Sequence, residues 1–344
     1  ELLLDGQTIG GRAQLSIGDN SGSNYSATGY GLLGEQLDVL AYYNFVDRDN
    51  YEVGGSDIKD ANGDVIAGTD GEVRGLEGEL DDALIKFGWN IDNNQRIQLS
   101  YESYTDDGDY SYRPDMGLAT DLAITNSLEV PLLWPTEFTR DTLTLNYELS
   151  LGSTYLKVAA YSNTSELWRD ETGWAENPAY APWAAIVIGE ATNDGMNLIA
   201  ETAFDGNISH DITYGFDYVK HSTDYKAKGV SETLSSGEEA TNLALFIQDR
   251  ITFNEQLSFI PGLRYDNYDI DSAVTNEQFR NTSLALALEY HVSNDLLIKL
   301  SGTELFKGPE ISEVFVGAGL NETANSNIKE ETGINYELAF AYQA

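Results

Sequence analysis

Residues 142–149, TLTLNYEL, alternate between polar and apolar side chains at every step. Successive side chains of a β-strand point to opposite faces, so Leu143, Leu145, Tyr147 and Leu149 would share one face and the polar residues the other. The stretch therefore predicts a strand with one apolar and one polar side.

The same alternation recurs along the whole chain and predicts about fourteen strands. They are expected at residues 11–18, 24–33, 36–46, 82–91, 95–104, 141–150, 153–164, 195–204, 208–220, 241–252, 256–270, 281–291, 295–305 and 331–342. Few windows have the apolar spacing of a helix, and no apolar stretch approaches the 18 or so residues of a spanning helix. We therefore expect an all-β protein.

The connections between these strands alternate in length. Short turns, such as those at 34–35 and 151–152, alternate with long connections. The long connections are expected at about 47–81, 105–140, 165–194, 221–240 and 306–330, with a short exception near 271–280. In an antiparallel sheet this places short turns at one end and long loops at the other, as in transmembrane barrels. We expect an antiparallel up-and-down transmembrane β-barrel, with a secreted β-sandwich or propeller as the alternative.

Composition excludes several classes of function. The formal net charge is −38, which repels phosphate backbones, so we expect no nucleic-acid partner. There are no cysteines, hence no disulfides and no thiolate metal sites. The sequence contains no GxSxG, HExxH or P-loop motif, so we expect no enzyme. The excess of Asp and Glu is interpreted as a solvated acidic surface. The alternative is that acidic loops bind divalent ions that bridge to lipopolysaccharide.

Residues 245–268, LFIQDRITFNEQLSFIPGLRYDNY, combine a QD strand, a tight turn and a GLRYD strand. The stretch is similar to a strand-turn-strand unit in the barrels of TonB-dependent receptors. Residues 3–18, LLDGQTIGGRAQLSIG, are similar to the junction between the plug and the first barrel strand of such receptors. The resemblance implies a barrel of about 22 strands around an N-terminal plug. Residues 1–10 are then expected to end the plug and residues 11–344 to form a partial barrel lacking the last strands. A complete 14-stranded passive channel is the alternative.

Two shorter motifs point to one branch of these receptors. Residues 305–315, LFKGPEISEVF, resemble the FRAP box of heme and hemoglobin receptors, and residues 325–330, NSNIKE, resemble their NPNL box. The matching positions are Phe306, Lys307, Gly308, Pro309, Asn325, Asn327 and Ile328. Lys307 replaces Arg, Gly308 replaces Ala, and Ser326 stands where proline is usual.

The resemblance also implies a histidine between the two boxes, because neutral imidazole is a good axial ligand for heme iron. Residues 310–324 contain none. His221 opens a predicted outer loop with Tyr225 nearby, and either residue is a candidate iron ligand or a plain polar loop residue.

Aromatic residues supply the other ligand candidates. Trp168, Trp174 and Trp183, with Tyr180, gather in the predicted loop 165–194 and are interpreted as a platform for a flat ligand or as self-packing of the loop. Phe315 is a further candidate contact for the ligand.

The resemblance implies energy-coupled uptake of an iron complex through the outer membrane of a Gram-negative bacterium. Heme or hemoprotein iron is favoured by the FRAP-like box, and a ferric siderophore is the alternative because of the missing histidine. The expected partners are the TonB complex, reached through the plug, and outer-membrane lipid with lipopolysaccharide. No intrinsic cofactor and no resident metal are expected, since the iron complex is cargo.

Overall fold

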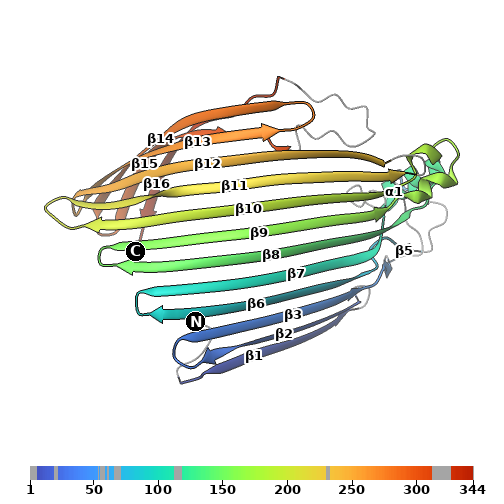
Figure 1. Ribbon diagram of the computed structural model, residues 1–344, viewed down its shortest axis with the longest axis horizontal. Coiled ribbons are helices and arrows are strands. Elements are labelled where there is room, and N and C mark those ends of the chain that lie inside the picture. Colours follow the sequence, from blue (N-terminus) through green and yellow to red (C-terminus); the bar gives the residue numbers. More distant parts are fainter. Residues whose placement is uncertain are drawn as a thin grey trace.

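The computed structural model is dominated by one antiparallel sheet of fourteen strands (Figure 1). It describes residues 6–18, 22–52, 54, 59, 62–65, 71–111, 118–229, 233–311 and 327–343. The strands of this sheet are β1 (Ile9–Gly18), β2 (Gly22–Leu33), β3 (Leu37–Arg48), β6 (Gly78–Asp92), β7 (Gln95–Ser111), β8 (Leu133–Leu151), β9 (Thr154–Asp170), β10 (Ala185–Phe204), β11 (Ser209–Gly229), β12 (Thr233–Asn254), β13 (Leu257–Asp271), β14 (Asn276–Ser293), β15 (Leu296–Lys307) and β16 (Glu331–Tyr342).

The order of the strands in the sheet follows the order of the chain, as in an up-and-down barrel. Each predicted strand corresponds to one observed strand, so the all-β prediction is confirmed. The sheet curves strongly, and β1 and β16 are its edges, which do not pair with each other in the described part of the chain (Figure 1). This is the open, curved wall expected of a partial barrel, and not two packed sheets. The assignment of residues 1–10 to a plug stays a prediction.

Short turns gather at one end of the wall and longer connections at the other (Figure 1). Two of the short turns use glycine in the left-handed region, Gly34 at φ 80° and Gly152 at φ 59°, where other residues are strained. The opposite end carries α1 (Leu118–Leu128), the 3₁₀ turns η2 (Thr172–Glu176) and η3 (Ala181–Trp183), and the small hairpin of β4 (Tyr51–Glu52) and β5 (Glu72–Val73). Among the described residues, no helix is both long and apolar enough to cross a bilayer.

The strands extend much further toward the loop end than the sequence indicates. The predicted loop at 221–240 is wrong, because β11 and β12 continue through it and Lys228 still pairs with Thr233. The loops predicted at 105–140 and 165–194 likewise shrink, to 112–132 and 171–184. Alternation disappears from these extensions because both faces meet water, while backbone pairing continues unaffected.

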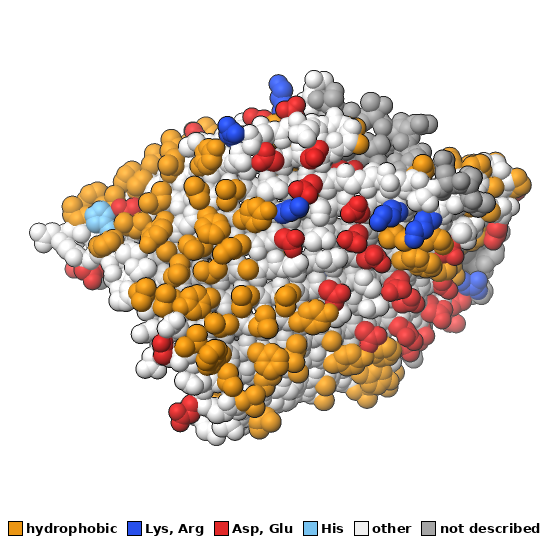
Figure 2. Space-filling view, viewed as in Figure 1, with side chains coloured by type: hydrophobic (Ala, Val, Ile, Leu, Met, Phe, Trp, Pro, Cys, Tyr) orange, Lys and Arg blue, Asp and Glu red, His pale blue; other side chains and the backbone are white. Residues whose placement is uncertain are grey.

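The outer face of the wall is apolar over the half nearest the short turns. Leu145 of β8 pairs with Leu99 of β7, which pairs with Phe87 of β6, and these three side chains are 46%, 43% and 48% exposed. Figure 2 shows hydrophobic side chains over this half and mainly acidic ones, with a few basic ones, over the half near the loops. A sheet that exposes its apolar face in a continuous band is built to face lipid.

The inner face is polar and held by ion pairs between strands. Arg96 contacts Asp38 at 2.8 Å, and Arg140 contacts Glu102 at 2.7 Å. Glu289 forms ion pairs with both Arg250, at 2.5 Å, and Lys299, at 3.5 Å. Charges lining the concave side keep it wet, as in the polar interior of a water-filled transmembrane barrel.

Candidate ligand-binding site

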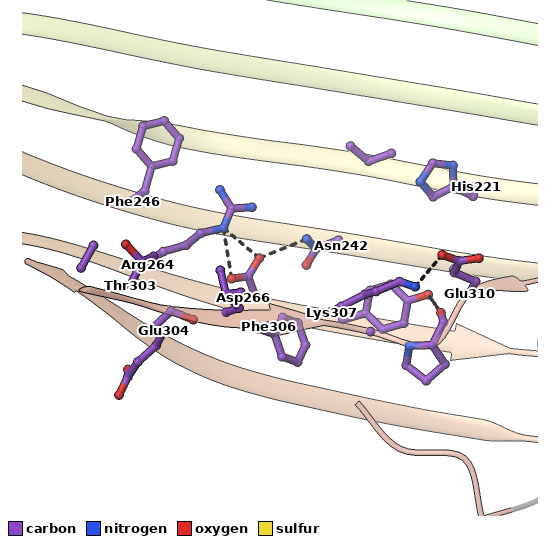
Figure 3. Close-up of a pocket in the computed structure, with 18 of the residues that line it drawn as sticks. His221, Asn242, Phe246, Arg264, Asp266, Thr303, Glu304, Phe306, Lys307 and Glu310 are labelled. Carbon is purple, nitrogen blue, oxygen red and sulfur yellow. Dashed lines mark hydrogen bonds and ion pairs between the residues drawn. The ribbon is translucent and has the colours of Figure 1, made fainter. Parts of the chain in front are cut away.

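A hollow of about 970 Å³ lies on the inner wall where β10 to β15 approach the loop end. Its volume is at the upper end of the range of ligand pockets in proteins, about 300–1,000 Å³. The lining includes His221 from β11 and Arg264 and Asp266 from β13 (Figure 3). It also includes the segment Phe306–Ile311, which begins in the last two residues of β15 and continues beyond the strand. The fold therefore joins a single histidine to the FRAP-like segment, although 85 residues separate His221 from Phe306.

His221 lies inside β11, and the expectation that it opens an outer loop is wrong. It pairs with Asn193 of β10 and Ala240 of β12, and its Nδ1 is hydrogen-bonded to Oδ1 of Asn193. Along β11 the outward apolar residues end at Tyr218, so His221 lies beyond the membrane band. Partial desolvation by its neighbours lowers the pKa of the imidazole and favours the neutral form, while the side chain stays exposed on the inner wall.

Tyr225 also lies in β11, four residues further toward the tip, and pairs with Gly189 and Ser236. It is not among the residues that line the hollow. The structure thus separates the two candidate iron ligands, and only His221 faces the hollow.

Arg264 and Asp266 form the polar floor of the hollow and were not expected as site residues. Nε of Arg264 donates to both carboxylate oxygens of Asp266 at 3.1 Å, and its Nη1 donates to Asp217 at 2.7 Å. The amide nitrogen of Asn242 donates to Asp266 at 3.1 Å, while its Oδ1 is buried and has no hydrogen-bond partner among the described residues. The GLRYD motif contains Arg264 and Asp266, and alternation alone would have placed both on the polar face.

The FRAP-like segment packs against Tyr268 of β13. The Tyr268 hydroxyl donates to the backbone oxygen of Pro309, and a Cβ added to Gly308 would lie 2.6 Å from the Tyr268 ring. Lys307 forms an ion pair with Glu310 at 2.6 Å. Glycine in place of alanine at position 308 is explained by this ring, which occupies the space of a side chain.

The flanks of the two boxes meet at one hydrophobic cluster. Ile311, just after the FRAP-like segment, and Ile328 of the NPNL-like segment both pack with Tyr268 around buried Ala240 and Ile270. Asn327 lies in a turn just before Ile328. Phe315 and Asn325 lie outside the described residues.

Three of the four aromatic residues expected in the loop, Trp174, Tyr180 and Trp183, form one cluster, which Trp134 joins. Trp174 is 5% exposed and packs against Trp134, at 5.5 Å between ring centroids, and against Tyr180 and Trp183 at 5.6 and 5.7 Å. Trp134 lies at the start of β8, which sequence reasoning did not connect with this loop.

Trp168 does not belong to the predicted loop. It lies in β9, where it pairs with Glu137 and Ile188 and alternates onto the outer face. The cluster is mostly internal packing of the loop, and only Trp183, at 63% exposure, presents a broad aromatic surface.

No group of three or more His, Asp or Glu side chains placed to hold a metal ion is found in the described part of the chain. The remaining histidines, His210 and His291, lie beside short turns at the opposite end of the wall, and His210 contacts Asp249 at 2.7 Å.

Residues 86–344 match the family model "TonB dependent receptor-like, beta-barrel". The chain is 25% identical over 328 residues to the heme transporter BhuA of Brucella ovis, an alignment that covers 92% of this chain and 41% of that protein. The chain therefore spans less than half the length of this curated relative.

Solved structures share the fold. The FrpB iron transporter of Neisseria meningitidis superposes with a TM-score of 0.74 at 18% identity, over 99% of this chain and 52% of FrpB. The Serratia marcescens hemophore receptor HasR, solved with its hemophore HasA and heme, superposes with a TM-score of 0.73 at 14% identity, over 98% of this chain and 52% of HasR. At these identities the likeness concerns the architecture of the wall.

Proposed function

The chain belongs to the TonB-dependent receptors, and from that premise we propose that it forms part of an outer-membrane receptor for energy-coupled uptake of an iron complex, with heme or hemoprotein iron favoured. The observation that carries this proposal is the hollow on the inner wall, where His221 and the FRAP-like segment line one cavity. The heme transporter among its relatives supports the choice of cargo.

In this proposal the ligand first binds at the loop end, where the hollow opens on the inner wall (Figure 3). It then passes along the polar inner face when the TonB complex rearranges the plug. The ion pairs on that face keep it hydrated. The apolar outer band would place the protein in the outer membrane of a Gram-negative bacterium, with lipopolysaccharide around its loop half (Figure 2). The chain holds no cofactor of its own in this scheme, because the iron complex is cargo.

A ferric siderophore is the second candidate cargo. The observation in its favour is the absence of histidine from residues 310–324, where the heme receptors that the chain resembles carry one. A siderophore delivers iron already coordinated, so its receptor needs no iron ligand of its own.

Growth of an iron-starved strain tests this function. The gene for the full-length protein is deleted and restored, and growth is measured with heme, hemoglobin or a ferric siderophore as the only iron source. We expect growth on heme only when the gene is present and only when TonB is present. Gene-dependent growth on the siderophore but not on heme would select the second cargo. Growth that is independent of the gene on every source would contradict the proposal.

A further inference from the structure

We propose that His221 bonds the iron of heme in this receptor through its Nε2, and that Asn193 is the positioning residue that fixes the imidazole for it. This inference rests on the proposed function and deepens it by assigning an iron ligand to the strand wall in place of the histidine-free segment 310–324.

The first argument is the tautomer of His221. Nδ1 of His221 faces Oδ1 of Asn193, which can only accept a hydrogen bond, so this contact favours the tautomer that carries the ring proton on Nδ1. The lone pair then lies on Nε2, for which no partner is found among the described residues. Histidines that bind metals commonly donate their other ring N–H to a carbonyl or carboxylate oxygen, which fixes the ring and raises its basicity.

The second argument is access. His221 is exposed on the inner wall, and the nearby lining positions Ala191, Val219 and Ala240 have small or medium side chains. These leave the face of the imidazole open to the hollow, whose volume of about 970 Å³ admits a flat macrocycle.

The third argument is the polarity of the surroundings. Beyond His221 the hollow offers the guanidinium of Arg264, which is held by ion pairs with Asp217 and Asp266 (Figure 3). A mostly apolar pocket with a few fixed polar groups is suited to an amphipathic ligand that carries carboxylates on one edge.

The test measures binding of two ligands to the purified full-length protein in detergent. Ferric heme offers iron to a ligand, and iron-free protoporphyrin IX offers the same ring without it. The variants are His221→Ala, Asn193→Ala and Asn193→Asp, with His291→Ala as a matched control at the other end of the wall. Retention of the heat-modifiable folded band on gels establishes that each variant keeps its barrel.

For heme we expect a histidine-ligated absorption spectrum in the wild type and in His291→Ala, and loss of that histidine's signature in His221→Ala. Asn193→Ala should weaken heme binding by about 10–100-fold, and Asn193→Asp should restore it, because a carboxylate accepts the same N–H. Binding of the iron-free ring should be nearly unchanged in all variants, since no iron bond is involved.

Two results would overturn the assignment. One is an unaltered heme spectrum in His221→Ala, and the other is an equal loss of heme and of the iron-free ring, which would make His221 a wall contact only. Heme-dependent growth that survives His221→Ala alongside an unaltered spectrum would reject this ligand and leave the proposed function standing. Failure of gene-dependent growth on heme would reject the proposed cargo itself.

Discussion

At the residue scale, Gly308 stands where the ring of Tyr268 leaves no room for a side chain. We expect Gly308→Ala to displace Tyr268, to break its hydrogen bond to Pro309 and to cost about 1–3 kcal/mol through overpacking. The measurement is the free energy of unfolding in lipid vesicles, together with hydrogen exchange in β13 and β15. Gly189→Ala is the control, because nothing lies within 4 Å of its added Cβ. Equal stability of both variants would contradict the packing account.

A second residue-scale prediction concerns Asp106, which clamps the loop ends of β3 and β7. It accepts from Arg48 at 2.5 and 3.1 Å and also from the Tyr110 hydroxyl. Burial opposes its ionisation, but these hydrogen bonds outweigh burial and hold the pKa of Asp106 below its ordinary value. The clamp should therefore be intact above the ordinary aspartate pKa of about 3.9, and should be lost as the pH falls through the lowered folded value.

Hydrogen exchange at the loop ends of β3 and β7 measures this clamp. At neutral pH, Asp106→Asn should lower local stability by about 1–3 kcal/mol, because it leaves Arg48 without its carboxylate. Asp107→Asn is the control, since Asp107 is exposed on the outer face. If both variants exchanged like the wild type, the clamp would carry no stability.

At the scale of the element, the connections 112–132 and 171–184 are joined by one aromatic cluster. Trp134 is 1% exposed and Trp174 is 5% exposed, and Val130 and Ala184 are buried with them. Such a cluster stabilises the described parts of these connections, which are built from α1, η2 and η3 and not from strands of the sheet.

Trp174→Ala should lower the stability of these two joined connections by about 3–5 kcal/mol, as for other large aromatic deletions in cores. Limited proteolysis within residues 171–184 should then become much faster. Trp183→Ala should cost about 1 kcal/mol or less, because that ring is 63% exposed. Equal rates of proteolysis in the two variants would show that the cluster does not stabilise the two connections.

Elements were predicted well where one face is apolar and poorly where both faces are polar. The alternation predicts all fourteen strands, but it ends β11 at residue 220, whereas the strand continues to Gly229. The missing part reads HSTDYKAKG and has no apolar side, so its pairing with β12 leaves little trace in the pattern. For the same reason the pattern predicts loops at His221, Tyr225 and Trp168, which lie in β11 and β9.

At the scale of the whole molecule, the outer apolar band decides whether the wall enters a membrane. Leu145 is 46% exposed within the band and pairs with Leu99, and Thr144, the preceding residue of the strand, points to the opposite, inner face. We expect Leu145→Arg to oppose insertion by about 2–4 kcal/mol if it lies near the midplane, and Thr144→Arg to be tolerated. Assembly of the heat-modifiable barrel in outer membranes measures both. Equal assembly of the two variants would contradict the assignment of faces.

The candidate site belongs to this scale too. Residues near 193, 221, 264 and 308 come from β10, β11, β13 and the segment after β15, and nothing in their local sequence links them. Two of the site residues, Arg264 and Asp266, could have been predicted from the sequence, because the GLRYD motif contains both. Asn193 could not be predicted from the sequence, because nothing local distinguishes it from the many other polar residues. Its role depends on the strand pairing that places it opposite His221.

The sequence by itself determined the all-β class, the number and order of the strands, the ends at which short and long connections lie, and the resemblance to receptor barrels. These properties follow from local alternation and from turn chemistry, which act between residues near each other in the chain. Only the tertiary structure decided where the strands end, which aromatic rings meet, and that His221 shares a hollow with the FRAP-like segment. Those outcomes depend on register across several strands and on the curvature of the sheet, which bring together side chains that no local pattern connects.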